Sequence, residues 1–154
     1  MNIESGLHVF IVNYYPPCPQ PEIAKGLPPH TDFTIFGHLL ETGHNGLQVQ
    51  HDGKWVSVNP LPNSYLIHVG DQLEILTNGK YKSVVHKVSV NNKTRRMSIG
   101  LGYLPPVETA ISPAPELVSE DHPPAFRAIT YAESLELKQK CQCDNKSFVD
   151  LLRI

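Results

Sequence analysis

The chain has 154 residues, of which 40% are hydrophobic and 18% are charged, and its formal net charge is −2. This length and apolar content suit one domain with its own core, and the charge excludes the basic surface that nucleic acids require. The first ten residues lack the pattern of a signal peptide, and no apolar run is long enough to span a membrane. Three cysteines without a framework spacing favour a reducing compartment, so we expect a cytoplasmic protein with neither nucleic-acid nor membrane partners.

Short apolar segments separated by turn residues follow one another along most of the chain. The fourteen prolines fall mainly in 16–29, 60–62 and 105–124, and the segments between them are rich in Val, Ile, Leu and Tyr. Asp52-Gly53 between two alternating segments predicts a hairpin, and Thr77-Asn78-Gly79-Lys80 predicts another turn. The strands that we expect cover 8–15, 30–40, 46–50, 54–60, 64–70, 81–90 and 96–104.

Strands at these spacings predict an all-β core with the architecture of a double-stranded β-helix, or jelly roll. After the strands, residues 130–141 have the pattern of a C-terminal helix, with Thr130 as the N-cap and Glu133 three residues later. We therefore expect a jelly-roll domain at 1–110, followed by a C-terminal extension with a helix at 111–154.

Two side chains of the metal-binding type stand two positions apart in the sequence PPHTDF. In a strand, successive side chains point to opposite faces, so His30 and Asp32 share one face and Thr31 takes the other. A hydrogen-bonded surface pair is the alternative. His86 is the best third ligand, because it lies on a strongly alternating segment that a jelly roll can bring close. Two histidines and one carboxylate form the facial triad of non-haem Fe(II) oxygenases, and zinc is the rival metal.

A second polar pair follows His86 by ten residues, where Arg96 and Ser98 share one face of a predicted strand. A guanidinium beside a hydroxyl can hold a carboxylate through two hydrogen bonds. This pair can therefore anchor one end of a small diacid whose other end reaches the metal. The alternative is a surface arginine, a role that suits Arg95, since its side chain points the other way.

Six motifs, in order, resemble the plant 2-oxoglutarate (2OG) and Fe(II)-dependent dioxygenases, the family that contains flavonol synthase and anthocyanidin synthase. The motifs are VNYYPPCPQP, HTD, GLQV, GKWVSVNPLPN, GDQLEILTNGKYKSVVHKV and RMS, and they run from about Val9 to Pro106. The Fe(II) ligands that the resemblance implies are His30, Asp32 and His86. The residues that it implies as contacts of 2OG are Asn13, Tyr15, Arg96 and Ser98.

The resemblance implies an oxidoreductase that uses non-haem Fe(II), 2OG and O2, with ascorbate as a candidate reductant. Such an enzyme hydroxylates, desaturates or demethylates a small specialised metabolite and releases succinate and CO2. The oxidising power belongs to the iron, so no protein acid or base is assigned as a catalytic group. The remaining histidines, His38 and His68 among them, are expected to have structural roles.

Members of this family usually carry a helical region before the NYYPPC strand, and this chain begins almost at that strand. We therefore expect the C-terminal catalytic half of a longer protein, in which the metal ligands are intact even where activity is poor. Two other functions remain open. One is a non-catalytic binding or regulatory module that keeps the jelly roll; the other is a cupin-type metal isomerase, which leaves Arg96-Met97-Ser98 unexplained.

Overall fold

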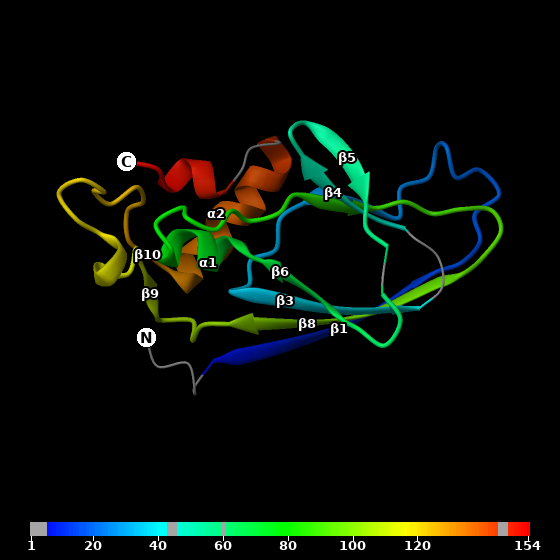
Figure 1. Cartoon of the computed structure of the whole chain (residues 1–154), viewed down its shortest axis with the longest axis horizontal. Helices are drawn as coiled ribbons and strands as arrows, with labels where there is room; N and C mark the ends of the chain where they lie inside the picture. Colours follow the sequence, from blue (N-terminus) through cyan, green and yellow to red (C-terminus); the bar gives the residue numbers. More distant parts are fainter. Residues whose placement is uncertain (1–5, 43–45, 60, 145–147) are drawn as a thin grey trace.

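The computed structural model describes residues 6–42, 46–59, 61–144 and 148–154. Within these ranges the chain forms two four-stranded sheets, a two-stranded sheet and a few helices (Figure 1). The strands are β1 (Leu7–Tyr15), β2 (Leu27–His30), β3 (Phe36–Thr42), β4 (Leu47–His51), β5 (Lys54–Ser57), β6 (Leu66–Val69), β7 (His86–Val88), β8 (Arg96–Leu104), β9 (Ala110–Ile111) and β10 (Ile129–Thr130). The helices are α1 (Asp71–Leu76) and α2 (Tyr131–Asp144), and the 3-10 helices are η1 (Pro115–Leu117) and η2 (Val149–Leu152).

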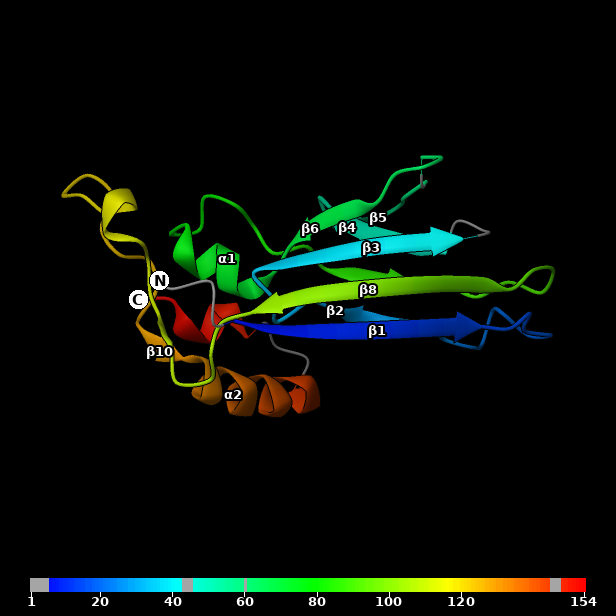
Figure 2. The same ribbon diagram turned by 90° about the horizontal axis from the view of Figure 1, so that it is seen from below.

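The two large sheets have the strand orders β1-β8-β3-β6 and β2-β7-β4-β5. Their neighbouring strands pair antiparallel, and most neighbours are distant in the sequence. The long strands β1, β8 and β3 lie side by side in front of the second sheet (Figure 2). This double sheet confirms the predicted all-β jelly roll with a C-terminal helix.

The main cluster of buried apolar side chains lies at one end of the sheets, where α1 meets the C-terminal segment. Its members are Ile75, Ile111, Phe126, Ile129, Phe148, Val149 and Leu152. Ile75 belongs to the predicted 1–110 domain and the others to 111–154, so the two parts share this core. The boundary after residue 110 falls within β9 and stays a prediction.

Local signals in the sequence account for one turn and one helix start. Asp52 and Gly53 have positive φ values of 48° and 72°, which is the backbone of the predicted tight hairpin between β4 and β5. At the start of α2, the Thr130 Oγ1 accepts a hydrogen bond from the Glu133 amide (3.2 Å). The Glu133 carboxylate accepts one from the Thr130 amide (2.9 Å), so the predicted capping box is present.

Three expectations about elements were wrong. The predicted strand at 30–40 is two strands, because β2 ends at His30 and β3 begins at Phe36. The predicted strand at 81–90 is reduced to β7. The helix α1 was missed, since six residues are too few to show a helical repeat.

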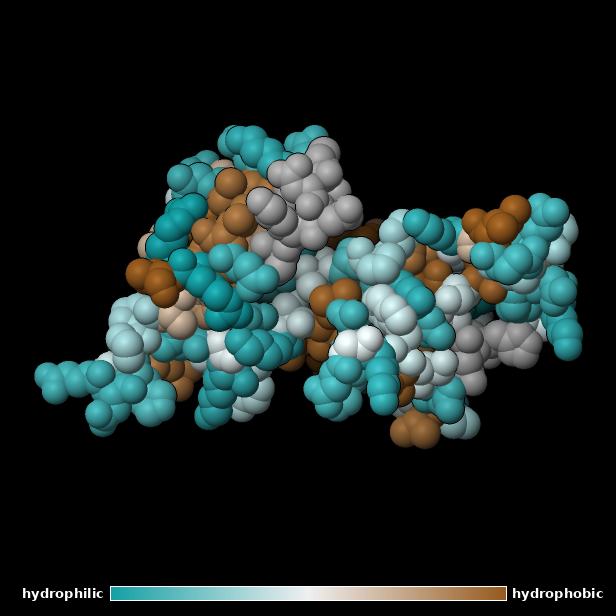
Figure 3. Space-filling model, turned by 90° about the horizontal axis from the view of Figure 1, so that it is seen from above, coloured by the Kyte–Doolittle hydropathy of each residue, from teal (hydrophilic) through white to brown (hydrophobic). Residues whose placement is uncertain are grey.

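The face seen from the side of β5 and α2 is mainly hydrophilic (Figure 3). Larger apolar side chains, such as Phe10, Val12 and Met97, are exposed on the outer face of the first sheet. No helix in the described part of the chain is long and apolar enough to cross a membrane.

Candidate metal centre

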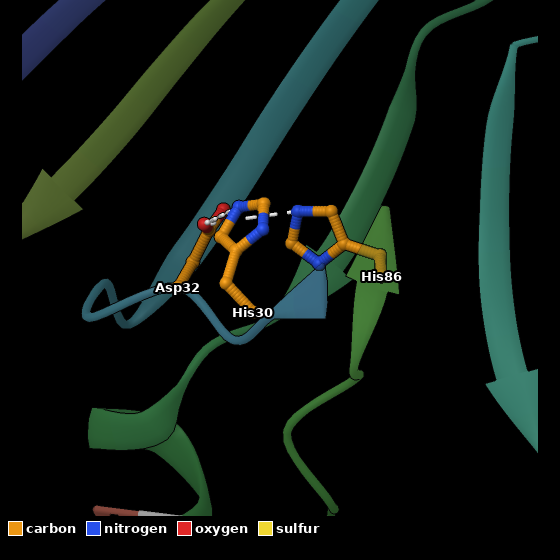
Figure 4. A group of neighbouring side chains, drawn as sticks. All are labelled: His30, Asp32 and His86. Carbon is orange, nitrogen blue, oxygen red and sulfur yellow. Dashed lines mark ion pairs between the residues drawn. The ribbon is translucent and has the colours of Figure 1, made fainter. Parts of the chain in front are cut away.

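Strand pairing brings His30, Asp32 and His86 to one point. His30 ends β2 and His86 begins β7, and the two residues lie opposite each other in the antiparallel pair. The Asp32 Oδ1 lies 3.5 Å from the His30 Nε2 and 3.8 Å from the His86 Nε2. The three side chains point toward one another (Figure 4), and their ligand atoms all lie within 4.8 Å. This separation suits one metal ion, because ligands about 2.1 Å from a metal at right angles lie about 3 Å apart.

Backbone hydrogen bonds hold both histidine rings in the orientation that a metal needs. The His30 Nδ1 donates to the carbonyl of Pro28 (2.8 Å), and the His86 Nδ1 donates to the carbonyl of Val84 (3.0 Å). Each bond places a proton on Nδ1 and turns Nε2, the other ring nitrogen, toward Asp32. The two rings therefore present their nitrogens to the same space.

The electrostatics of the cluster keep Asp32 ionised and His86 neutral. Burial raises the pKa of Asp32, but hydrogen bonds with His30 and His68 outweigh it and hold this pKa far below its ordinary value. Burial, with the neighbouring His30, lowers the pKa of His86. For His30, burial lowers the pKa, but the bond with Asp32 and the Pro28 carbonyl raise it more, so the net shift is upward. An ionised carboxylate and a neutral imidazole are the forms that bind metals.

His68 belongs to this cluster, although a structural role was expected for it. Its Nε2 donates to the second oxygen of Asp32, Oδ2, at 2.5 Å, and its ring centroid lies 5.0 Å from that of His86. The ring lies over Gly37, the residue opposite His68 in the β3–β6 pair, where a Cβ would overlap the imidazole. Asp32 thus uses one oxygen for His68 and directs the other at His30 and His86.

The loop between His30 and Asp32 is fixed from its far side by α1 and α2. Asp32 follows the end of β2, so the strand periodicity that predicted a shared face with His30 does not apply to it. Thr31 nevertheless points away from His30 and Asp32, as predicted, and contacts Asp71. The Thr31 Oγ1 donates to the Asp71 carboxylate (3.1 Å), and Lys138 of α2 donates to that carboxylate and to the Thr31 carbonyl (both 2.5 Å). Both charged side chains of this contact are buried.

The four residues predicted to contact 2OG are also brought together. In the β1–β8 pair, Asn13 lies opposite Ser98 and Tyr15 lies opposite Arg96. Arg96 and Ser98 are 2% and 3% exposed, and the Arg96 Nη1 donates to the Ser98 Oγ (3.3 Å). The guanidinium lies 5.3 Å from the centre of the Tyr15 ring. Burial raises the pKa of Tyr15 against the opposing effect of Arg96, so the phenol keeps its proton.

The candidate metal cluster and the four residues predicted to contact 2OG line one cavity of about 670 Å³ between the two sheets. The remainder of the lining is largely apolar and comes from both sheets, with Tyr131 and Leu135 contributed by α2. The polar groups therefore stand within a mainly apolar chamber, which is the usual character of a small-molecule site.

Comparison with known proteins decides the family. The profile of the 2OG-Fe(II) oxygenase superfamily matches residues 6–105. The chain belongs to this superfamily. Protein DMR6-LIKE OXYGENASE 2 of Arabidopsis thaliana is 46% identical over 147 residues, which cover 94% of this chain and 42% of the relative. Thebaine 6-O-demethylase of Papaver somniferum is 42% identical over 151 residues, which cover 97% of this chain and 42% of the relative.

A solved structure of the same superfamily has the same fold. The crystal structure of JOX2 in complex with 2OG, Fe and JA superposes with a TM-score of 0.83 at 40% identity. The match covers 86% of this chain and 40% of JOX2. The chain therefore spans less than half the length of each of these three similar proteins.

Two contacts in the site were not foreseen from the sequence. They are the bond of His68 with Asp32 and an ion pair of Glu41 with Arg96. The only signal in the sequence was the period of two, which places His68 with Leu66, and Glu41 with Leu39, on the cavity side of their strands.

Proposed function

We propose that this chain is the catalytic domain of an oxidoreductase that uses Fe(II), 2OG and O2 to oxidise a small specialised metabolite, releasing succinate and CO2. The observation that carries the proposal is the single cavity that joins the His30, Asp32 and His86 cluster to Arg96 and Ser98. Membership of the superfamily supports it. A cupin-type metal isomerase, the alternative predicted from the sequence, does not explain why Arg96 and Ser98 line the same cavity.

The donor set suits Fe(II). Two imidazole nitrogens and one carboxylate oxygen leave coordination positions open, whereas a structural zinc site closes its shell with four protein ligands. We assign His30, Asp32 and His86 as the ligands of this ion. The metal, with 2OG and O2, supplies the oxidising power that removes hydrogen from a C–H bond of the substrate.

The residues of the chain bind 2OG and orient the substrate. Arg96 and Ser98 donate to the distal carboxylate of 2OG, and Asn13 and Tyr15 give two further polar contacts from the neighbouring strand. The apolar walls of the cavity exclude water and hold the reacting carbon of the substrate. No protein acid or base is required.

Relatives support a plant specialised metabolite as the substrate class. Thebaine 6-O-demethylase and an oxoglutarate-dependent flavonoid 7-O-demethylase of Ocimum basilicum are both similar to this chain. The choice between hydroxylation, desaturation and demethylation depends on how the substrate lies in the cavity. We keep a cytoplasmic location as a prediction from the cysteine count.

The test is succinate formation from 2OG by the purified chain with Fe(II) and O2, in the presence of a panel of plant phenolics and alkaloids. We expect succinate that depends on both Fe(II) and 2OG and that is lost in His86→Ala. Exposed His51→Ala is the matched control and should keep the activity. Binding of Fe(II) and 2OG without any succinate would contradict an active domain and favour the non-catalytic module.

A further inference from the structure

Glu41 of β3 pairs with Arg96, the arginine that we assign to 2OG. In the β3–β8 pair Glu41 lies directly opposite Ser98, so its side chain stands on the same face of the sheet as Ser98 and Arg96. The side chains of Glu41 and Arg96 are only 6% and 3% exposed. A buried pair of this kind is weakly screened by water and salt.

The hydrogen bonds of Arg96 show what remains free for a ligand. Its Nη1 donates to the Ser98 Oγ, its Nη2 donates to the Glu41 carboxylate, and its Nε is buried without a partner. A guanidinium has five N–H donors, so donors remain for a second carboxylate. Its charge, in contrast, is already balanced by Glu41.

A carboxylate that arrives at Arg96 therefore meets a neutral ion pair. The other assigned contacts, Ser98, Asn13 and the protonated phenol of Tyr15, carry no positive charge. Two carboxylates would then share one guanidinium in a place with little water, and like charges that are this close repel strongly.

We propose that Glu41 sets the affinity of this domain for 2OG by competing, through its charge, with the distal carboxylate for Arg96. The inference rests on the proposed function. It extends to product release, because succinate keeps a carboxylate for Arg96 but has lost the keto oxygen that chelates the metal. Glu41 thus favours the departure of succinate from the site.

The test is calorimetric titration of 2OG into the Fe(II)-loaded chain without oxygen, for the wild type and for Glu41→Gln. The amide oxygen still accepts from Arg96, so this change removes the charge and keeps the contact. We expect the Kd for 2OG to fall about tenfold or more. Succinate should also bind more tightly. Glu120→Gln, an equal change at an exposed position, should leave both Kd values unchanged.

A second measurement separates competition from a merely structural role. The rise in unfolding temperature that saturating 2OG produces should be larger for Glu41→Gln than for the wild type, because 2OG then neutralises an Arg96 charge that Glu41 no longer balances. Glu41→Ala removes the same charge and replaces Glu41→Gln in both measurements if the glutamine variant does not fold. A folded variant that binds 2OG no more tightly than the wild type would overturn the inference and leave the proposed function standing. Failure of every protein to bind 2OG would overturn both.

Discussion

At the scale of single residues, the site depends on how Asp32 divides its two carboxylate oxygens. Oδ2 accepts from His68, and Oδ1 faces His30 and His86. A carboxylate that is held through one oxygen presents the other oxygen in a fixed direction. It therefore binds a metal better than a carboxylate that rotates freely. Asp32 is also the one negative charge among the three assigned ligands.

Replacing Asp32 by Asn should abolish tight binding of Fe(II). The amide has nearly the same shape, but it lacks the negative charge that a divalent cation requires. The measurement is an anaerobic titration with Fe(II), followed by separation of free and bound metal. Asp52→Asn, at an exposed hairpin position, is the control. Unchanged affinity in Asp32→Asn would remove this residue from the metal site.

Replacing His68 by Leu should weaken Fe(II) binding by about 10- to 100-fold, because Asp32 loses the partner that orients it. The loss should be smaller than in Asp32→Asn, since all three assigned ligands remain. His51→Leu, at an exposed position, should bind as the wild type does. Equal affinities of His68→Leu and the wild type would show that His68 has no positioning role.

The sequence predicted the three assigned ligand residues, but it did not predict the side chains that surround them. His30, Asp32 and His86 were found from residue type, spacing and family resemblance, and the structure brings them together. The contacts of His68 and Glu41 could not be predicted, because they depend on the registers of β6 with β3 and of β3 with β8. Such registers are set by pairing between segments that are distant in the sequence.

At the scale of elements, α1 and α2 hold the loop that carries Asp32. The first amides of α1 donate to carbonyls of this loop, from Asp71 to Asp32 (2.8 Å) and from Gln72 to Thr34 (3.3 Å). Helix α2 contributes Lys138, which contacts both Thr31 and Asp71. The C-terminal extension therefore supports the candidate metal centre directly.

Replacing Lys138 by Met should lower the free energy of unfolding by about 3 to 5 kcal/mol, because the fully buried Asp71 carboxylate loses its cation. It should also weaken Fe(II) binding, since the Thr31 loop is no longer held. Urea denaturation measures the first effect. Exposed Lys140→Met is the control. The double change Lys138→Met with Asp71→Asn should recover part of the stability; no recovery would contradict a specific pair.

Elements with long alternating or capped patterns matched their predicted bounds, whereas the short elements α1 and β7 were missed or overextended. The strands β1 and β8 and the start of α2 lie within one residue of the predicted bounds. The segment 30–40 was wrongly taken as one strand, because Phe33, Thr34 and Ile35 form a run of apolar and β-branched side chains that leads into β3. Their loop conformation is stabilised by α1, which lies far along the chain.

At the scale of the whole molecule, the two sheets enclose the cavity while the main apolar cluster lies at their end. This arrangement leaves the space between the sheets open for ligands. It also places the three assigned metal ligands on the second sheet and the loop after β2, and Arg96 on the first sheet. We therefore expect a small diacid to reach from one sheet to the other.

Replacing Arg96 by Ala should spare Fe(II) binding and weaken 2OG binding by about 2 to 3 kcal/mol, the scale of a charge-assisted hydrogen-bonded pair. The two effects separate because the assigned metal ligands come from the other sheet. Calorimetry with each ligand gives both values. Arg95→Ala, at an exposed neighbouring position, is the matched control. An unchanged Kd for 2OG in Arg96→Ala would exclude the assigned role.

The most direct test of the account is an anaerobic titration of the Fe(II)-loaded chain with 2OG, followed by the visible charge-transfer absorption of a keto acid chelated to Fe(II). The account predicts an absorption band that saturates with 2OG and that is absent in His30→Ala. A band of equal intensity in His30→Ala, or no band from a folded wild-type chain, would contradict the claim that these residues assemble a site for Fe(II) and 2OG.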